Sequence, residues 1–446
     1  MNKPICEFLE KYNNKNPIRL HVPGHKGKNF LGCERYDLTE IDGADELYIP
    51  TGIIKESQEN ACKIFGCPTF YTVEGSSHAI RAMLYLTKIY AEKTNKNYKI
   101  LATRNVHKSF LSACALLGAD VEWIYNESSS NYFSNYLTPE ILEEYLNSIK
   151  ELPCALYVTS PDYLGNILDI ENLAKITNKY GVLLLVDNAH GAYLKFLDKH
   201  PISLGASMCA DSAHKTLPVL TGGAYLHLSS EIYKRLNGYV ETALNLFGTT
   251  SPSYLILSSL DNVNAYLENG YSNKLKAFIK KLDFLKTKLQ SAGYRFIGSE
   301  PLKLTIDAKY YGYTGQEFVE ILKNNDIFVE FYDFDYVVLM FTIEILDSEL
   351  KKIADVLLDI NKREKIEKTN FSQPKNQRAL QLKDVVFSLT KITDTKNALG
   401  KVYADFNIPC PPAVPIIMPG EVISNSTIEI FNYYKIDKVK IINIHG

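Results

Sequence analysis

The feature that most constrains this chain is a regular alternation of short apolar segments with amphipathic ones between residues 98 and 187. Four segments are typical of buried strands because they are almost uniformly apolar: YKILATR (98–104), VEWIYN (121–126), ALYVTS (155–160) and VLLLVD (182–187). Strands that are apolar on both faces and separated by helices predict a mainly parallel sheet covered on both sides. Open α/β sheets of this kind bind ligands at the carboxyl ends of their strands.

The sequence beyond about residue 255 has a different texture and predicts further domains. Amphipathic helical segments lead into a strand pair over FVEFYDFDYVVLMFTI (328–343) and a helix over ELKKIADVLLDINKREK (349–365), which indicates a smaller α+β module. The polar stretch 363–380 contains a proline and is typical of a linker. We therefore expect four parts: an N-terminal arm (1–50), a large domain (51–260), a small α+β domain (261–365) and a C-terminal domain (366–446).

Charge, hydropathy and cysteine usage exclude several classes of function. A net charge of −2 is not the basic footprint of a nucleic-acid-binding protein. No run of about 18 apolar residues occurs and the N-terminus lacks an apolar signal core, so we expect a cytoplasmic protein without a membrane segment. The eight cysteines contain no CxxC pair, which favours reduced thiols. Cys62 and Cys67 have no matching His/Cys pair, so we expect ordinary packing there and no metal site.

Two charged residues follow expected strands, and together they suggest a chemistry. Taken alone, Asp187 favours an N-cap for the segment NAHGAYL (188–194), and Lys215 favours a surface loop. A lysine held in a dry pocket has a lowered pKa, and its amine can form a Schiff base with an aldehyde. A carboxylate at a strand end can keep a pyridine nitrogen protonated, and this pairing is the one that pyridoxal phosphate enzymes use. We therefore expect Lys215 to be buried against such a cofactor.

A phosphorylated cofactor also needs an anion site, and the turn EGSS (74–77) is a candidate. It precedes the strongly helical segment HAIRAMLYLTKIYAEK (78–93), so its amides and the helix dipole face a dianion. Gly75 allows the backbone to approach closely, although such turns also serve as ordinary caps. His107, just after the first strand, can cover the face of a ring, but isolated histidines more often cap or pack.

Six motifs in strict order resemble the ornithine/lysine/arginine decarboxylases. They are HVPGHKG (21–27), DLTEIDGADELYIPTGIIKESQENACKIFG (37–66), NVHKS (105–109), VDNAHG (186–191), SAHKT (212–216) and TSPSY (250–254). The resemblance runs from residue 21 to about 260 and returns at PPAVPIIMPGE (411–421). That family consists of pyridoxal phosphate enzymes of the aspartate-aminotransferase fold (fold type I). The resemblance implies a large cofactor-binding α/β domain with a mostly parallel sheet, a smaller α+β domain and a C-terminal domain, as in the short branch of the family.

The resemblance also implies a role for each matching residue around the cofactor ring. Carried over, Lys215 forms the Schiff base with pyridoxal 5'-phosphate and Asp187 binds the pyridinium nitrogen. His107 stacks on the ring and His190 lies close to it.

The phosphate is assigned a second group of residues in the same way. The group that holds it comprises Gly75, Ser76, Ser77, Ser212 and His214. In this family the segment TSPSY reaches across a dimer interface, so Thr250 or Ser251 is expected to complete the site of the neighbouring subunit in a homodimer.

The activity implied by the resemblance is α-decarboxylation of arginine, lysine or ornithine, which gives agmatine or a diamine. Lys215 or His214 is the candidate acid that returns a proton to the α-carbon. The cationic tip of the substrate needs an acidic or carbonyl partner. Four acids are candidates, and the preferred substrate stays open: Asp45, Glu46, Asp162 and Glu421.

Two alternatives remain at this stage. One is another fold type I enzyme, an aminotransferase or a desulfurase, although no arginine suited to an α-carboxylate stands near residues 350–370. The other is a catalytically silent regulatory homologue, against which the presence of both Lys215 and Asp187 argues.

Overall fold

The computed structural model of the chain describes residues 1–125, 137–410 and 414–443. Asn126 and residues 411–413, which belong to two of the segments discussed above, lie outside this range. The chain divides into two compact units, each described here by itself: the first comprises Met1–Asn97 and Ile170–Lys274, the second Tyr98–Asp169 and Leu275–Gly446.

The first unit contains four hydrogen-bonded strands in the order β1–β7–β6–β5. β5 and β6 are parallel, whereas β7 runs antiparallel to both β6 and β1. Every residue of β5, β6 and β7 is buried, as expected for strands this apolar. The strands are β1 (Thr69–Thr72), β5 (Leu183–Asp187), β6 (Met208–Asp211) and β7 (Ala224–Leu228).

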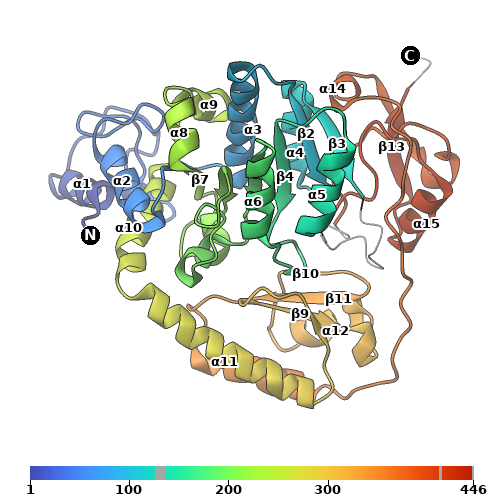
Figure 1. Ribbon diagram of the computed structural model, residues 1–446. Helices are drawn as coiled ribbons and strands as arrows, with labels where there is room; N and C mark the ends of the chain where they lie inside the picture. The colour runs from blue at the N-terminus through green and yellow to red at the C-terminus, as the bar shows by residue number, and fades with distance from the viewer. Residues whose placement is uncertain (126–136, 411–413, 444–446) are drawn as a thin grey trace. The chain divides into compact units, whose positions relative to one another are not determined.

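Helices of the first unit cover these strands and build a separate layer. Figure 1 shows α3 (Gly75–Lys93) in dark blue, beginning directly after β1 and packing on β6 and β7. α1, α2 and α10 pack on one another at the left of the same view. The bounds are α1 (Pro4–Asn14), α2 (Ile53–Phe65), α6 (Ile170–Lys179), α7 (Ala213–Thr216), α8 (Ser230–Leu236), α9 (Val240–Phe247) and α10 (Tyr254–Glu268), with 3-10 turns η1 (Glu34–Tyr36) and η2 (Ala192–Leu197).

The second unit begins with three parallel strands in the order β4–β2–β3. Helix α4 follows β2, and α5 follows β3 and begins at a Thr-Pro pair. Thr138 Oγ1 accepts a hydrogen bond from Ile141 N (3.3 Å), and proline is favoured in the first turn because it lacks an N–H. The bounds are β2 (Lys99–Thr103), β3 (Asp120–Ile124), β4 (Ala155–Thr159), α4 (Lys108–Leu117) and α5 (Pro139–Ser148). The parallel α/β pattern predicted from the sequence is confirmed.

An antiparallel sheet in the order β10–β11–β9–β8 and two packed helices form the α+β module. α12 begins with a capping box in which Thr314 and Glu317 bond each other's backbone N–H groups. The elements are α11 (Tyr271–Ser291), β8 (Phe296–Ile297), β9 (Lys303–Asp307), η3 (Lys309–Tyr311), α12 (Gly315–Lys323), β10 (Phe331–Tyr332), β11 (Tyr336–Met340) and α13 (Asp347–Asp359).

The helix expected over residues 349–365 ends earlier, at Asp359. The chain then turns to an extended conformation at Ile360. Arg363 N donates to Tyr311 O (3.1 Å), and Ile366 N donates to Lys309 O (2.9 Å). These tertiary hydrogen bonds replace the helical ones, and sequence periodicity does not report such competition.

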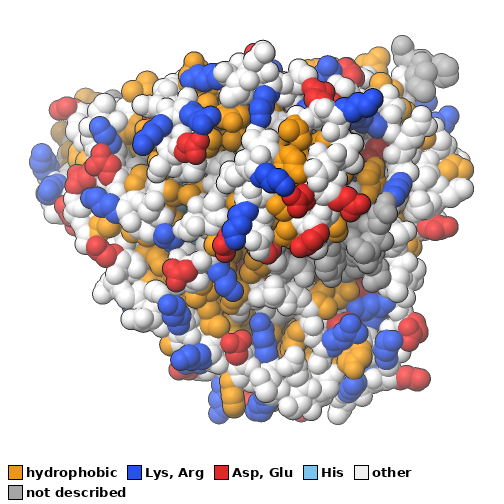
Figure 2. Space-filling model, in the orientation of Figure 1, with side chains coloured by type: hydrophobic (Ala, Val, Ile, Leu, Met, Phe, Trp, Pro, Cys, Tyr) orange, Lys and Arg blue, Asp and Glu red, His pale blue; other side chains and the backbone are white. Residues whose placement is uncertain are grey.

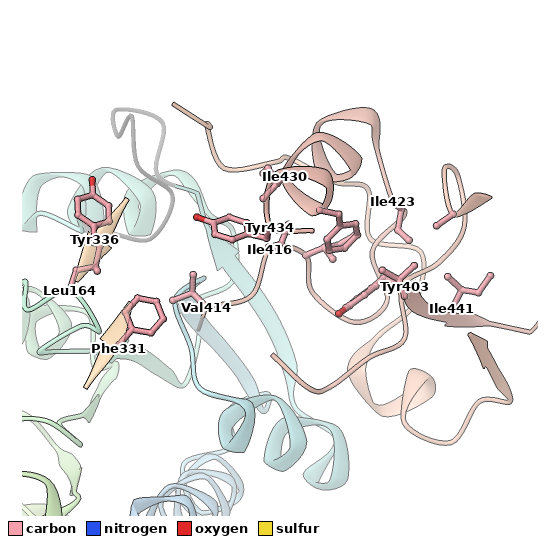
Figure 3. Close-up of a cluster of buried hydrophobic side chains, with 14 of the residues drawn as sticks. Leu164, Phe331, Tyr336, Tyr403, Val414, Ile416, Ile423, Ile430, Tyr434 and Ile441 are labelled. Carbon is pink, nitrogen blue, oxygen red and sulfur yellow. The ribbon is translucent and has the colours of Figure 1, made fainter. Parts of the chain in front are cut away.

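The C-terminal segment packs on the α+β module through one apolar cluster (Figure 3). Phe331 and Tyr336 of the module lie in this cluster with Ile416, Ile430 and Tyr434 of the C-terminal segment. The C-terminal elements are α14 (Leu382–Val385), β12 (Thr390–Asp394), η4 (Thr395–Asn397), α15 (Asn425–Tyr433) and β13 (Lys438–Ile442).

The surface agrees with the near-neutral net charge. Acidic and basic side chains are interspersed over the face that Figure 2 shows. Within the described part of the chain, no helix combines the length and apolarity needed to cross a bilayer.

Candidate active site

Asp187 is the last residue of β5 and stands at the carboxyl end of a parallel strand pair. It lies in register with Ala210 of β6, and its side chain is buried. Ala189 N donates a hydrogen bond to Asp187 Oδ1 over 3.2 Å. The next helical turn, η2, begins only at Ala192 with Gly191 at its N-cap, so Asp187 does not serve as a helix N-cap.

Lys215 lies in the short helix α7, which follows β6 on the same edge of the first unit's strands. Its Nζ lies 3.0 Å from Nε2 of His190, which follows β5 and is buried. The lysine itself is half-buried rather than fully enclosed. The expectation of a buried lysine is therefore only partly met, and a half-buried amine is the form that a small molecule can reach.

The turn before α3 has the features of an anion site. Ser212 Oγ donates a hydrogen bond to Ser76 Oγ over 2.8 Å, so the segment after β6 meets the first turn of α3. Gly75 N donates to Gly222 O (2.7 Å), which ties the loop after α7 to the same turn. Gly75 has φ +71° and open space where a side chain would stand. The first turn of α3 carries no acidic residue, so its N–H groups and helix dipole favour an anion.

His214 is held in one tautomer by the neighbouring loop. Its Nδ1 accepts a hydrogen bond from Gly222 N over 3.0 Å, so a neutral ring carries its hydrogen on Nε2. Burial lowers the pKa of His214, and the positive charge of Lys215 lowers it further. The neutral ring therefore offers Nε2–H as a hydrogen-bond donor at neutral pH.

The remaining predicted site residues lie elsewhere. His107 belongs to the second unit, where it is the N-cap of α4. Its Nδ1 accepts from Ser109 N (3.2 Å), which is the capping role weighed above. Thr250 and Ser251 are exposed residues of the first unit, before α10.

Three of the four acids considered for the substrate's tip have structural partners. The carboxylate of Asp45 accepts five backbone N–H groups around the start of α2. Asp162 accepts from Leu164 N and from both the backbone and side chain of Asn166. Glu421 is also engaged, in the ion pair described next. Glu46 is exposed.

The pair of Arg104 and Glu421 is a feature that sequence reasoning missed. The guanidinium of Arg104 binds the carboxylate of Glu421 in a bidentate manner, with Nη1–Oε1 at 2.5 Å and Nη2–Oε2 at 2.9 Å. Both side chains are almost fully buried. The partners stand 317 residues apart in the sequence, and no spacing signal connects them.

Comparison with known proteins places the fold and the chain. The fold is that of α/β enzymes of fold type I, as the lysine decarboxylase of Francisella novicida shows: the structures agree with a TM-score of 0.80 at 17% identity, over 99% of this chain and 81% of that one. The chain belongs to the Orn/Lys/Arg decarboxylase family. The family's major domain matches residues 3–298 and its C-terminal domain matches residues 365–441.

Two relatives align with nearly the whole chain. The arginine decarboxylase of Bacillus subtilis is 29% identical over 95% of this chain and 92% of its own length. The arginine decarboxylase of Bacillus anthracis is 30% identical, with coverage of 96% and 92%. The family, the fold class and the activity of an amino-acid decarboxylase predicted from the sequence are therefore confirmed.

Proposed function

We propose that this chain removes the α-carboxylate of arginine with pyridoxal 5'-phosphate as its cofactor. The relatives named arginine decarboxylase support this choice of substrate because they match over nearly their full length. The named lysine decarboxylase of Pseudomonas aeruginosa matches over only 42% of its length, at 23% identity. Lysine and ornithine remain the other substrates to test. The observation that carries the proposal is the Lys215 amine 3.0 Å from His190, beside the buried Asp187.

The residues of the first unit fit a phosphorylated pyridine aldehyde. The open space at Gly75, the two serines of the first turn of α3 and the hydroxyl of Ser212 supply donors for a phosphate. Asp187 supplies a buried carboxylate for a protonated ring nitrogen, and Lys215 supplies a primary amine at the same edge.

Each of these residues has a defined task in the proposed reaction. Bound pyridoxal phosphate supplies the electron sink for the charge left when CO₂ departs. Asp187 holds a proton at the ring nitrogen, and Ser76, Ser77 and Ser212 hold the phosphate. Lys215 anchors the cofactor through its Nζ and then carries the proton to the α-carbon. His190 Nε2 orients that amine, and His214 Nε2–H donates toward the phosphate.

Three further assignments belong to the same proposal. His107 covers the ring face, and Thr250 or Ser251 completes the phosphate site of the second subunit in a homodimer. Their exposure leaves Thr250 and Ser251 free to reach a neighbour. Glu46 is the best remaining acid for the guanidinium of the substrate, because its carboxylate is exposed while Asp45, Asp162 and Glu421 have structural partners. The cytoplasmic location stays a prediction.

The test is a substrate panel with two matched variants. Arginine, lysine and ornithine are supplied separately, and CO₂ and the amine product are measured. We expect release from arginine to exceed that from the other two by at least about tenfold. Borohydride treatment followed by peptide mass spectrometry is expected to place a pyridoxyl group on Lys215.

Lys215→Ala is expected to abolish both the label and CO₂ release. Asp187→Asn is expected to retain the label and to lower kcat by about two to three orders of magnitude. Asp261→Asn removes another buried carboxylate of the first unit, one that accepts from Ser57, and serves as the control. Full CO₂ release by Lys215→Ala would refute the assignment of the lysine.

A further inference from the structure

A second cluster of reactive side chains lies in the first unit, away from Lys215. His200, Cys209, Asp211 and His227 are fully buried, and their four ligating atoms lie within 4.8 Å of one another. Cys209 and Asp211 belong to β6, His227 belongs to β7, and His200 precedes β6. The proposed decarboxylation uses none of these four residues.

The distances within this cluster match a tetrahedral metal site. Asp211 Oδ2 lies 3.1 Å from His200 Nε2 and 3.2 Å from His227 Nε2. Cys209 Sγ lies 3.7 Å from both His200 Nε2 and Asp211 Oδ1. Zinc bonds of about 2.0 Å to nitrogen or oxygen and about 2.3 Å to sulfur set ligand atoms roughly 3.3–3.7 Å apart in a tetrahedron.

The hydrogen bonds around His227 leave its Nε2 as a bare lone pair. Thr69 Oγ1 donates its hydrogen to Cys67 O (3.0 Å), so His227 Nδ1, at 2.9 Å from the same oxygen, must be the donor in that contact. A neutral His227 then has no hydrogen on Nε2, which makes no hydrogen bond within the described part of the chain. This lone pair faces the carboxylate of Asp211, and two electron-rich atoms at 3.2 Å call for a cation between them.

The outer contacts are those that orient metal ligands. Metal-bound histidines commonly donate their other N–H to an oxygen, as His227 does to Thr69. Asn188 Nδ2 donates to Asp211 Oδ1 over 2.7 Å, which leaves Oδ2 for the ion. The ring of His200 packs against Phe65, with centroids 5.7 Å apart.

Charge balance also favours a divalent ion. Burial lowers the pKa of His227 and outweighs the nearby Asp211, so the ring is neutral. Burial alone would raise the pKa of Asp211, but the two histidines lower it, so the carboxylate is charged. Without an ion the cluster buries a net negative charge, which is costly. A zinc ion with one carboxylate and one thiolate makes a buried site of zero net charge.

We propose that His200, Cys209, Asp211 and His227 bind one zinc ion that has a structural role. Two nitrogens, one sulfur and one oxygen suit zinc, and four protein ligands leave no open position for catalysis. Asp211 precedes Ser212, and the Asp211 partner Asn188 follows Asp187. The ion would therefore fix the two strand ends that carry the candidate active site.

This proposal departs from the expectation that the chain binds no metal. That expectation rested on Cys62 and Cys67, whereas the ligands of this site come from an overlooked set. The alternative is a metal-free network in which a doubly protonated histidine pairs with Asp211, and the two alternatives differ in measurable ways.

The first measurement is metal content. The untagged holoenzyme, purified from zinc-supplemented cells without chelators, is analysed by mass spectrometry of the elements. We expect about one zinc per chain, falling to below about a tenth in Asp211→Asn and in Cys209→Ala. Cys114→Ala removes a buried thiol of the second unit and is expected to keep its zinc.

The second measurement uses the unaltered chain and so does not depend on the folding of variants. Zinc is removed with a chelator and Co²⁺ is added. A thiolate-to-cobalt charge-transfer band and intense tetrahedral d–d bands are expected, with recovery of the melting temperature lost on chelation. Cys209→Ala that remains folded is expected to lose only the charge-transfer band.

The proposal is overturned if the wild-type chain contains no stoichiometric metal and Co²⁺ produces neither band. Metal that persists unchanged in Asp211→Asn overturns it equally. Neither result bears on the decarboxylase proposal, which rests on CO₂ release and the label on Lys215.

Discussion

The ε-amino group of Lys215 lies 3.0 Å from Nε2 of His190, although the two residues follow different strands. β5 and β6 are parallel neighbours, so the segments after their carboxyl ends meet at one edge. A protonated lysine can donate only, so the imidazole Nε2 accepts in this contact. His190 is thereby placed to orient the amine on which the proposed chemistry depends.

Substitution of His190 tests this orienting role. His190→Ala is expected to lower kcat about tenfold to a hundredfold, because the lysine loses a charge-assisted hydrogen bond. His190→Gln offers an acceptor oxygen and is expected to recover several-fold of that loss. The pH profile of kcat should shift in both variants, which a purely structural role would not cause. Wild-type kinetics in His190→Ala would contradict the assignment.

The contact of Ser212 with Ser76 predicts a loss of cofactor affinity. Each alanine variant removes one hydroxyl from the proposed phosphate site, so the dissociation constant for pyridoxal phosphate should rise about tenfold. The double variant should lose less than the sum of the two, because the hydroxyls bond each other. Titration of the apoenzyme by absorbance measures this.

Ser272→Ala is the control for the serine variants. Its hydroxyl donates to Phe196 O over 3.0 Å, far along the chain from the turn before α3. Cofactor affinity should be unchanged in this variant. A lowered kcat with unchanged affinity in Ser76→Ala would argue against a phosphate site.

Much of the α/β fold could be predicted because its signals are local. Each uniformly apolar segment forms a strand, such as β5 at Leu183–Asp187, and the Thr-Pro pair at 138–139 begins a helix. The positions of Asp187 and Lys215 at one edge follow from the same logic, since parallel strands end on the same side.

The parts that could not be predicted depend on contacts between distant segments. The end of α13 at Asp359 is set by hydrogen bonds to η3. Asp45 is a structural acceptor because a turn wraps its carboxylate, and an isolated acid in a sequence does not reveal this. Arg104 meets Glu421 across 317 residues, which only the folded chain brings together.

The buried pair of Arg104 and Glu421 makes a prediction about stability. Glu421→Gln leaves a buried guanidinium without its charge partner, so the free energy of unfolding should fall by about 3 kcal/mol or more. The double variant Arg104→Met with Glu421→Met should be more stable than Glu421→Gln, because neither charge is left alone. Denaturation in urea measures both.

An exposed pair in the same unit provides the comparison. Lys365 and Glu367 are 49% and 85% exposed and lie 2.9 Å apart, so Glu367→Gln should cost less than about 1 kcal/mol. Equal losses in Glu421→Gln and Glu367→Gln would mean that burial does not decide the strength of the Arg104 pair.

Asp333 makes the stability of the second unit depend on pH. Burial raises the pKa of this carboxyl to about 7, and the charge of Asp335 adds to the effect. The folded chain therefore holds a proton that the unfolded chain releases, over the range from the ordinary carboxyl pKa to about 7. Stability contributed by this group is complete at low pH and is lost as the pH rises through 7.

Asp333→Asn should remove this dependence. The amide oxygen can still accept from Asp335 N and Tyr336 N, at 2.8 and 2.7 Å in the native chain. The variant should therefore gain stability relative to the wild type as pH is raised from about 5 to about 8, as measured by urea denaturation at each pH. Asp355→Asn, an exposed change on α13, should leave the pH dependence unaltered. A constant difference between Asp333→Asn and the wild type at all pH values would show that Asp333 is not protonated in the folded chain.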